Sequence, residues 1–119
     1  MSCLPPTASS SGRASMPEAL AAIGARTPAR IAATDGARGV LWLEAEAVRA
    51  MDAFAVDAID TLAAGDVFHG ACTLALAEGR PFEQALRFAA AAAAIKCTRP
   101  GGIAGAPTRR EVEAMVACR

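Results

Sequence analysis

The chain has 119 residues, of which 12 are basic and 12 are acidic, so its formal net charge is zero. This length suits one small domain or a piece of a larger one, and the charge balance gives no sign of a nucleic-acid or membrane-surface partner. The longest apolar stretch, residues 88–95, is far shorter than the roughly 20 residues that a membrane-spanning helix needs. The four cysteines are widely spaced without a C-x-x-C pair, which argues against a zinc or redox site and predicts a cytoplasmic protein; they are Cys3, Cys72, Cys97 and Cys118.

Residues 1–16 contain proline and serine, no acidic residue and no apolar run long enough for a secretory signal. We expect a disordered leader there, followed by a single domain over residues 17–119. The first helix is expected at 17–23, where proline stands at the first helical position, a glutamate lies in the first turn and Gly24 ends the apolar pattern.

Two short apolar runs, residues 30–34 and 39–44, flank the sequence "DGAR", which carries the aspartate-glycine signal of a tight turn. They are predicted to form paired strands. Residues 53–59 form a weaker candidate strand, because Phe54 and Val56 alternate with less apolar positions.

The second half of the chain is predicted to be helical. Apolar periodicity indicates one helix over 66–78 and another from Pro81 to about Cys97, whose six consecutive alanines allow close packing. A glycine-rich and proline-rich loop spans 99–107, and Thr108 with Glu111 forms the capping box of a last helix. Early strands and late helices favour an α/β fold, with too few strands for a complete layer.

The segment "DTLAAGD", residues 60–66, places two aspartates around small residues at the start of a helix. The first amides of a helix have no intrahelical partner, and the helix dipole is positive there. The amides of Ala63, Ala64 and Gly65 are therefore expected to suit a phosphate or a growing negative charge. Asp66 either caps this helix or accepts a proton from an attacking hydroxyl.

Other polar residues near this segment have simpler interpretations. Asp60 is expected to bind turn amides two residues on, and His69 is more simply a partly buried polar residue than a functional one. Thr34, Gly36 and Gly39 would allow a nucleotide to approach the backbone, although glycines in a hairpin need no such reason. Neither a G-x-x-x-x-G-K-[ST] loop nor a G-x-G-x-x-G fingerprint occurs in the sequence.

The order of these motifs resembles the C-terminal portion of the ribokinase-like (PfkB) carbohydrate kinases. Residues 60–70 match the family signature D-T-x-[GA]-A-G-D followed by F-x-G, "ATDGARGVLWL" resembles its strand-turn-strand, and "RFAAAAAAIKCTRPGGIAGAPTRREVE" resembles its closing helices. The resemblance implies an α/β, three-layer αβα sandwich of the ribokinase type, with only the C-terminal part present. Residues 17–119 would be the nucleotide-binding and catalytic-base part, without the N-terminal part and the lid.

The activity that this resemblance implies is transfer of the ATP γ-phosphoryl group to a sugar hydroxymethyl group. Asp66 would be the catalytic base, and Ala63, Ala64 and Gly65 would form the anion hole. ATP and Mg²⁺ would be the cofactors. Residues that would lie along the nucleotide are Thr34, Gly36, Gly39, Gly65 and Ala90, the last of which stands where many members have asparagine.

The resemblance also implies a site for a monovalent cation such as K⁺. Its ligands would be Asp60 and the main-chain carbonyls of Leu62, Lys96, Arg99, Gly101 and Gly105. Ala63 replaces the commoner glycine of the signature, a change expected to cost little because the amide remains.

Two other functions stay open. The first is a truncated, non-catalytic remnant that binds nucleotide or a partner subunit. The second is an ordinary α/β domain in which "DTLAAGD" only caps a helix. The expected partner of a kinase is a small-molecule sugar, without nucleic acid or membrane. Strands missing from the sheet would leave an unpaired edge, which favours self-association or pairing with an N-terminal half.

Overall fold

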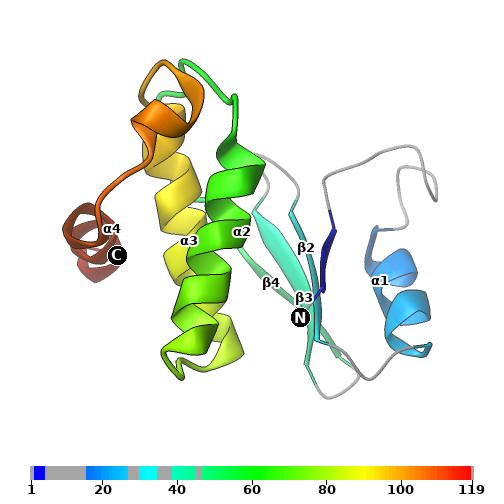
Figure 1. The fold of residues 1–119 in the computed structure, drawn as a ribbon. Helices are drawn as coiled ribbons and strands as arrows, with labels where there is room; N and C mark the ends of the chain where they lie inside the picture. The colour runs from blue at the N-terminus through cyan, green and yellow to red at the C-terminus, as the bar shows by residue number, and fades with distance from the viewer. Residues whose placement is uncertain (1, 5–15, 27–29, 35–38, 45–46, 119) are drawn as a thin grey trace. The chain divides into compact units, whose positions relative to one another are not determined.

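The computed structural model describes residues 2–4, 16–26, 30–34, 39–44 and 47–118. The chain divides into two compact units, Met1–Asp52 and Ala53–Arg119, each of which is described by itself. The first unit contains the sheet and one helix, and the second is helical (Figure 1). None of the helices in the described ranges is long and apolar enough to cross a membrane.

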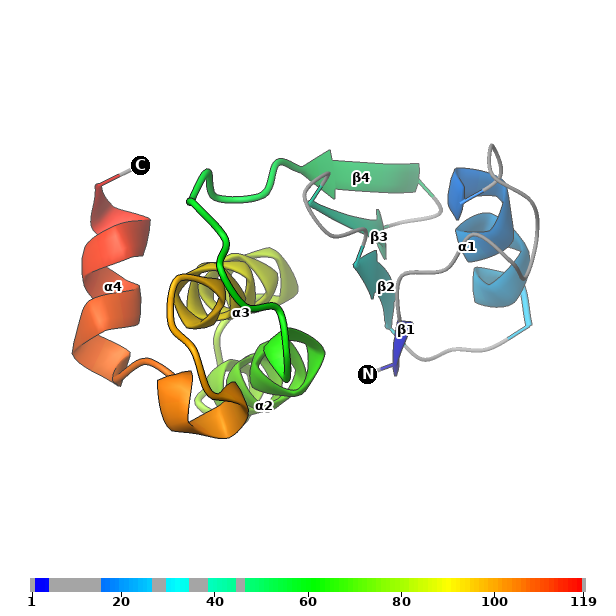
Figure 2. The same ribbon diagram turned by 90° about the horizontal axis from the view of Figure 1, so that it is seen from above.

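The sheet of the first unit has four strands in the order β1-β2-β3-β4. β1 (Ser2–Leu4) runs parallel to β2 (Ile31–Thr34), whereas β2, β3 (Val40–Glu44) and β4 (Ala47–Met51) are successively antiparallel. The pairing of 30–34 with 39–44 is confirmed, with Ala33 opposite Leu41, and the "DGAR" turn between them lies outside the described residues. Helix α1 (Met16–Gly24) lies along one face of this sheet (Figure 2).

An apolar cluster joins α1 to that face of the sheet. Leu20 is 1% exposed and packs with Ile31 and Ala33, and partly buried residues from α1, β3 and β4 complete the cluster. Period-two alternation explains why alternate residues of β2 and β3 share the face, because successive strand side chains point to opposite sides. Burial of this cluster stabilises the unit by removing apolar surface from water.

Two sequence-based expectations differ from the structure here. Ser2–Leu4 form a strand where a disordered leader was predicted, because they pair with the already formed edge of β2, a partner that local composition does not reveal. Residues 53–59 are not a strand; the fourth strand is Ala47–Met51, which pairs with β3 through a very short connection. Tertiary pairing therefore overrides the weak strand propensity of "AVRAM".

The second unit is built from α2 (Ala64–Ala77), α3 (Phe82–Cys97), the short 3₁₀ helix η2 (Gly102–Gly105) and α4 (Arg109–Ala117). The views in Figures 1 and 2 show α2 and α3 side by side, with α4 next to α3. Small buried residues, including Ala75 on α2 and Ala85 and Ala89 on α3, have no exposed surface, which allows the two backbones to approach closely. The predicted helices and the close packing of the alanine run are thus confirmed.

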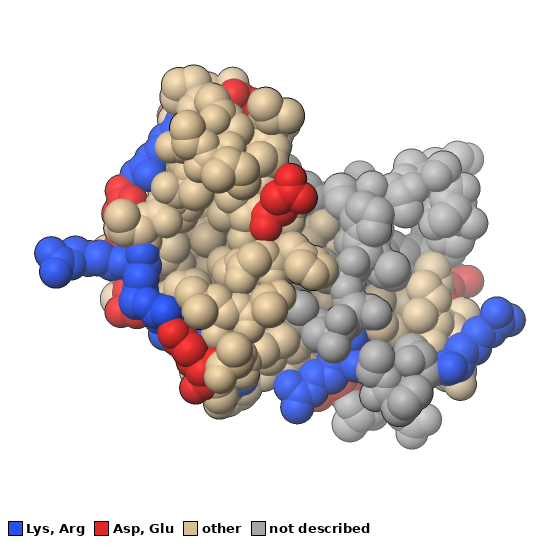
Figure 3. Space-filling model, viewed as in Figure 1, with Lys and Arg blue, Asp and Glu red and all other residues tan. Residues whose placement is uncertain are grey.

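Ion pairs connect α4 to the rest of the unit. Glu78, just after α2, accepts hydrogen bonds from Arg109, and Arg80 lies 3.6 Å from Glu113. Arg80 and Arg109 also face the ring of Phe88, at 4.8 and 5.8 Å from its centroid. Figure 3 shows such mixed acidic and basic groups at the edge of the unit near α4.

The predicted capping box at the start of α4 is confirmed. The main-chain N–H of Glu111 donates to the Thr108 hydroxyl, and that of Thr108 donates to the Glu111 carboxylate at 2.8 Å. The same carboxylate pairs with the guanidinium of Arg99. Hydrogen bonds first from Arg99 and then from Thr108 lower the pKa of Glu111 to about 2.

We expect this contact to make stability depend on acid pH. The pKa of Glu111 is lowered in the folded chain. Its contribution to the free energy of unfolding is therefore fully present above about pH 4.5 and is lost as the pH falls towards 2. Glu111→Gln should therefore flatten the decline of melting temperature between those two pH values. Glu83→Gln, an exposed change on α3, is the matched control and should leave the slope unchanged; equal slopes for all three proteins would contradict the assignment.

Candidate active site

The turn before α2 is tied to the end of α3. The amides of Ile59 and Asp60 both donate to the carbonyl of Cys97, at 2.8 and 3.1 Å. The Asp60 carboxylate accepts from the amide of Leu62 at 2.9 Å through one oxygen and from the amide of Gly101 at 3.0 Å through the other. The expected hydrogen bond from Asp60 to a turn amide two residues on is confirmed. The Asp60 carboxylate also binds the amide of Gly101 in the 99–107 loop.

These hydrogen bonds favour the charged form of Asp60. The amide of Leu62, then that of Gly101, and the nearby Lys96 charge lower the pKa of its carboxyl, against a smaller opposing effect of desolvation. Asp60 therefore remains an anion over the neutral range and is fully able to accept both amides.

Helix α2 starts from a residue in an unusual backbone conformation. Ala63 has φ 66° and ψ 8°, in the left-handed region, and is the only described non-glycine residue with a positive φ. The Ala64 amide donates to the carbonyl of Thr61 at 3.1 Å, and the first helical bond runs from Val67 to Ala63. Within the described part of the chain the amides of Ala63 and Gly65 make no hydrogen bond, so two of the three expected anion-hole donors are available and Ala64 is already used.

Asp66 lies in the first turn of α2 and is exposed. Among the described residues its carboxylate has no hydrogen-bond or ion-pair partner, and the start of α2 has no side-chain cap. Figure 3 shows acidic surface near the beginning of α2, next to uncharged described residues. The geometry thus gives no support to the capping interpretation and leaves an exposed carboxylate in the same helix start as the free amides.

The conformation of Ala63 has a cost that the sequence did not indicate. A left-handed conformation costs an L-residue about 1–2 kcal/mol, and glycine loses about 0.5–1 kcal/mol more than alanine in conformational entropy on folding. We expect Ala63→Gly to raise the free energy of unfolding by about 0.5–1 kcal/mol. Urea unfolding measures this change.

Ala64→Gly is the matched control for that variant. Ala64 is inside the helix, so the same substitution should lower the stability by up to about 1 kcal/mol. Equal effects at the two positions would show that Ala63 is not strained.

The residues assigned to a cation come together, but in an unexpected arrangement. The Lys96 ammonium donates to the carbonyl of Asp60 at 2.8 Å and to that of Arg99 at 3.1 Å. The carbonyl of Lys96 itself accepts from the Arg99 amide at 3.0 Å. The side chain of an expected carbonyl ligand thus reaches two other expected ligands, an arrangement that does not fit a free ion between them.

The loop that supplies the other expected ligands carries glycines in demanding positions. Gly101 has φ 94°, and its carbonyl accepts from Ala104 at 3.1 Å. Gly102 has φ 56° and is buried against the side chain of Leu62. A glycine-rich sequence is needed here because L-residues rarely adopt these conformations.

The expected nucleotide-binding residues are divided between the two units. Thr34 ends β2, and Gly39 is buried with φ 103° just before β3, so that position requires glycine. Gly36 lies outside the described residues. Gly65 is exposed at the start of α2, and Ala90 is half-buried within α3.

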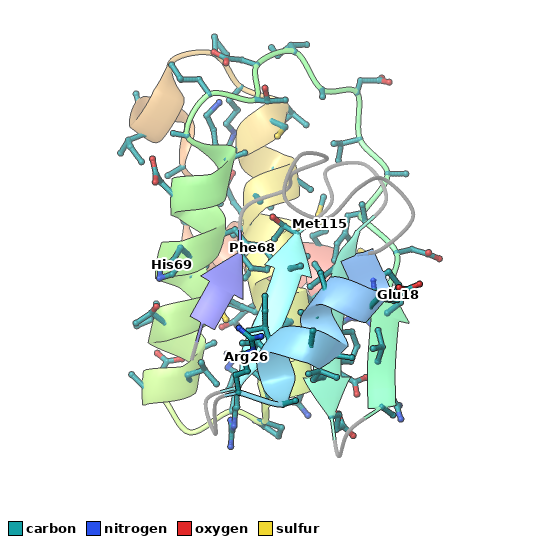
Figure 4. The ribbon with its side chains drawn as sticks, turned by 90° about the vertical axis from the view of Figure 1, so that its right-hand side faces the viewer. Glu18, Arg26, Phe68, His69 and Met115 are labelled. Carbon is teal, nitrogen blue, oxygen red and sulfur yellow. The ribbon has the colours of Figure 1, made fainter. Side chains whose placement is uncertain are left out.

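His69, one of two labelled neighbours on α2 in Figure 4, is exposed, whereas Phe68 is 4% exposed. The His69 carbonyl accepts from the Thr73 hydroxyl at 2.9 Å. His69 is therefore exposed and not partly buried as predicted, and its hydrogen bond with Thr73 uses the main chain and not the imidazole.

Sequence reasoning missed two features of the site. It assigned only the main chain of Lys96 to the turn, although a lysine directly after the apolar run 88–95, in the last turn of the helix, was a visible signal of a charge at the negative helix end. It also treated Gly105 only as a ligand. A Cβ there would lie 3.0 Å from the Cβ of Arg99 and 3.4 Å from the Lys96 stem.

Residues 7–109 match the family described as pfkB family carbohydrate kinase. The ribokinase of Bacillus subtilis is 40% identical over 89 residues, which cover 75% of this chain and 30% of that protein.

Solved structures give the same picture. A ribokinase from Thermotoga maritima matches 85% of this chain and 34% of its own, with a TM-score of 0.80 and 39% identity. The ribokinase of Arabidopsis thaliana, solved with ribose and ATP, matches 73% of this chain and 28% of its own length, with a TM-score of 0.68 and 31% identity. The chain thus spans about a third of the length of these proteins, and its α/β elements follow the ribokinase fold.

Proposed function

Because the chain belongs to the PfkB family of carbohydrate kinases, we propose that it carries the anion hole, the catalytic base and part of the ATP site of a sugar kinase. The observation that carries the proposal is the accessible Asp66 carboxylate beside the unpaired amides of Ala63 and Gly65. A helix start of this kind binds anions, and a carboxylate beside it is placed to accept a proton from a hydroxyl that attacks a bound phosphoryl group.

In the proposed reaction Asp66 accepts the proton of the sugar hydroxymethyl group. The oxygen then bonds to the γ-phosphorus of ATP while the bond to the ADP oxygen breaks. The amides of Ala63 and Gly65, with the positive end of α2, stabilise the negative charge on the transferring phosphoryl group. Thr34, Gly36, Gly39 and Ala90 are proposed to lie along the nucleotide.

Magnesium would enter together with ATP and neutralise phosphate charge. The described residues contain no cluster of three histidine, cysteine, aspartate or glutamate side chains able to hold a metal. This fits an ion bound largely through phosphate oxygens and water, which is common for Mg²⁺.

Ribose is the first sugar to test, because the ribokinase of Arabidopsis thaliana was solved with ribose and ATP. We propose that the reaction takes place in the cytoplasm. The experiment joins this chain to the missing N-terminal part of the Thermotoga maritima ribokinase and measures ADP formation with ribose, fructose and no sugar. Sugar-dependent ADP formation is expected. Sugar-independent ATP hydrolysis would contradict a sugar acceptor, and no turnover in a folded chimera that binds ATP would favour the non-catalytic alternative.

A further inference from the structure

Lys96 is the one charged side chain that is buried in the described part of the chain, with 0% of its surface exposed. A buried ammonium without partners is strongly unfavourable, because it loses its hydration. Here it donates to the carbonyls of Asp60 and Arg99 and lies 4.0 Å from a carboxylate oxygen of Asp60. No buried side-chain nitrogen or oxygen among the described residues lacks a partner.

The surroundings of this ammonium are negative on several sides. Two carbonyl oxygens and the Asp60 carboxylate belong to two different loops, and the last turn of α3 adds the negative end of its helix dipole. These are the groups that would also surround a bound monovalent cation. The turn therefore requires one positive charge at this position to offset the oxygens gathered there.

The space around the Lys96 stem is shaped for it. Gly105 is buried, and a Cβ at that position would press within 3.4 Å of both the Cδ and Cε atoms of Lys96. The absence of a side chain at 105 thus leaves the channel through which the lysine reaches the two carbonyls.

We propose that the Lys96 ammonium is a built-in monovalent cation, which takes the place of a free K⁺ ion in holding the Asp60 turn against the 99–105 loop. The ammonium holds the Asp60 carbonyl, and the Asp60 carboxylate accepts from the Leu62 amide in the turn that leads into Ala63 and the free amides of α2. The anion hole is therefore organised without added cation. The consequence for turnover, independence of K⁺, rests on the proposed function.

The test uses the 119-residue chain and melting temperatures in KCl and in tetramethylammonium chloride at equal ionic strength. The wild-type chain should melt at the same temperature in both salts. Lys96→Ala should melt about 5–15 °C lower, since buried carbonyls lose their donor, and K⁺ should restore part of the loss by entering the space. Lys96→Met is the matched control: it fills the space without charge, so it should be destabilised and not rescued.

Two results would overturn the proposal. One is a saturable rise of the wild-type melting temperature in K⁺, which would mean that a free ion still binds. The other is an equal lack of response to K⁺ in Lys96→Ala and Lys96→Met, which would mean that the oxygens do not select a cation.

If the variants do not fold, amide resonances of the wild-type chain still test whether a free K⁺ ion binds. Its Leu62 and Gly101 amide resonances should not move when K⁺ replaces tetramethylammonium, and saturable movement would refute the proposal. None of these measurements uses ATP or sugar, so a failure of the proposed kinase activity would leave them unchanged.

Discussion

Asp66→Asn should reduce the turnover of the chimeric kinase by a factor of about 10²–10⁴, the usual contribution of general-base catalysis. This corresponds to about 3–5 kcal/mol of activation free energy. Asparagine has nearly the same size but cannot accept the hydroxyl proton. Because the Asp66 carboxylate makes no hydrogen bond among the described residues, the melting temperature and the affinity for ATP should change little.

The matched control is Asp57→Asn, the same chemical change at an exposed residue in the segment before the turn. It should retain full turnover. The capping interpretation of Asp66 makes the opposite prediction, with normal turnover for Asn and lower stability for Ala. Measuring kcat, ATP affinity and melting temperature for these variants separates the two, and more than about a tenth of wild-type turnover in Asp66→Asn would rule out the base assignment.

Gly105→Ala should destabilise the chain by about 1–3 kcal/mol, the usual range for overpacking a filled interior. The added Cβ would lie 3.0 Å from the Cβ of Arg99, which is part of a tight loop and cannot rotate away. The Lys96 stem on its other side is fixed by two hydrogen bonds. A melting temperature lower by several degrees is expected.

Gly70→Ala is the matched control for this effect. Gly70 lies inside α2, and a Cβ there would meet nothing within 4 Å. Alanine has the higher helix propensity, so this variant should gain about 0.5–1 kcal/mol. Changes of the same sign at the two glycines would show that the packing around Lys96 is looser than the structure indicates.

Short-range signals in the sequence predict the local elements and point to the family. The capping box of Thr108 and Glu111, the alanine-rich α3 and the pairing of β2 with β3 all follow from short-range signals, because caps, propensity and alternation act between residues close in sequence. The signature at residues 60–70 pointed to the kinase family, which the matches over residues 7–109 support.

Features that depend on residues distant in sequence become visible only in the folded chain. Ser2–Leu4 became a strand and 53–59 did not, because strand formation depends on an available edge. The left-handed Ala63 follows from the turn that Asp60 builds with Leu62 and Gly101. The position of the Lys96 ammonium is the clearest case: its partners are 3 and 36 residues away, and a buried charge is stable only where folding brings such oxygens together.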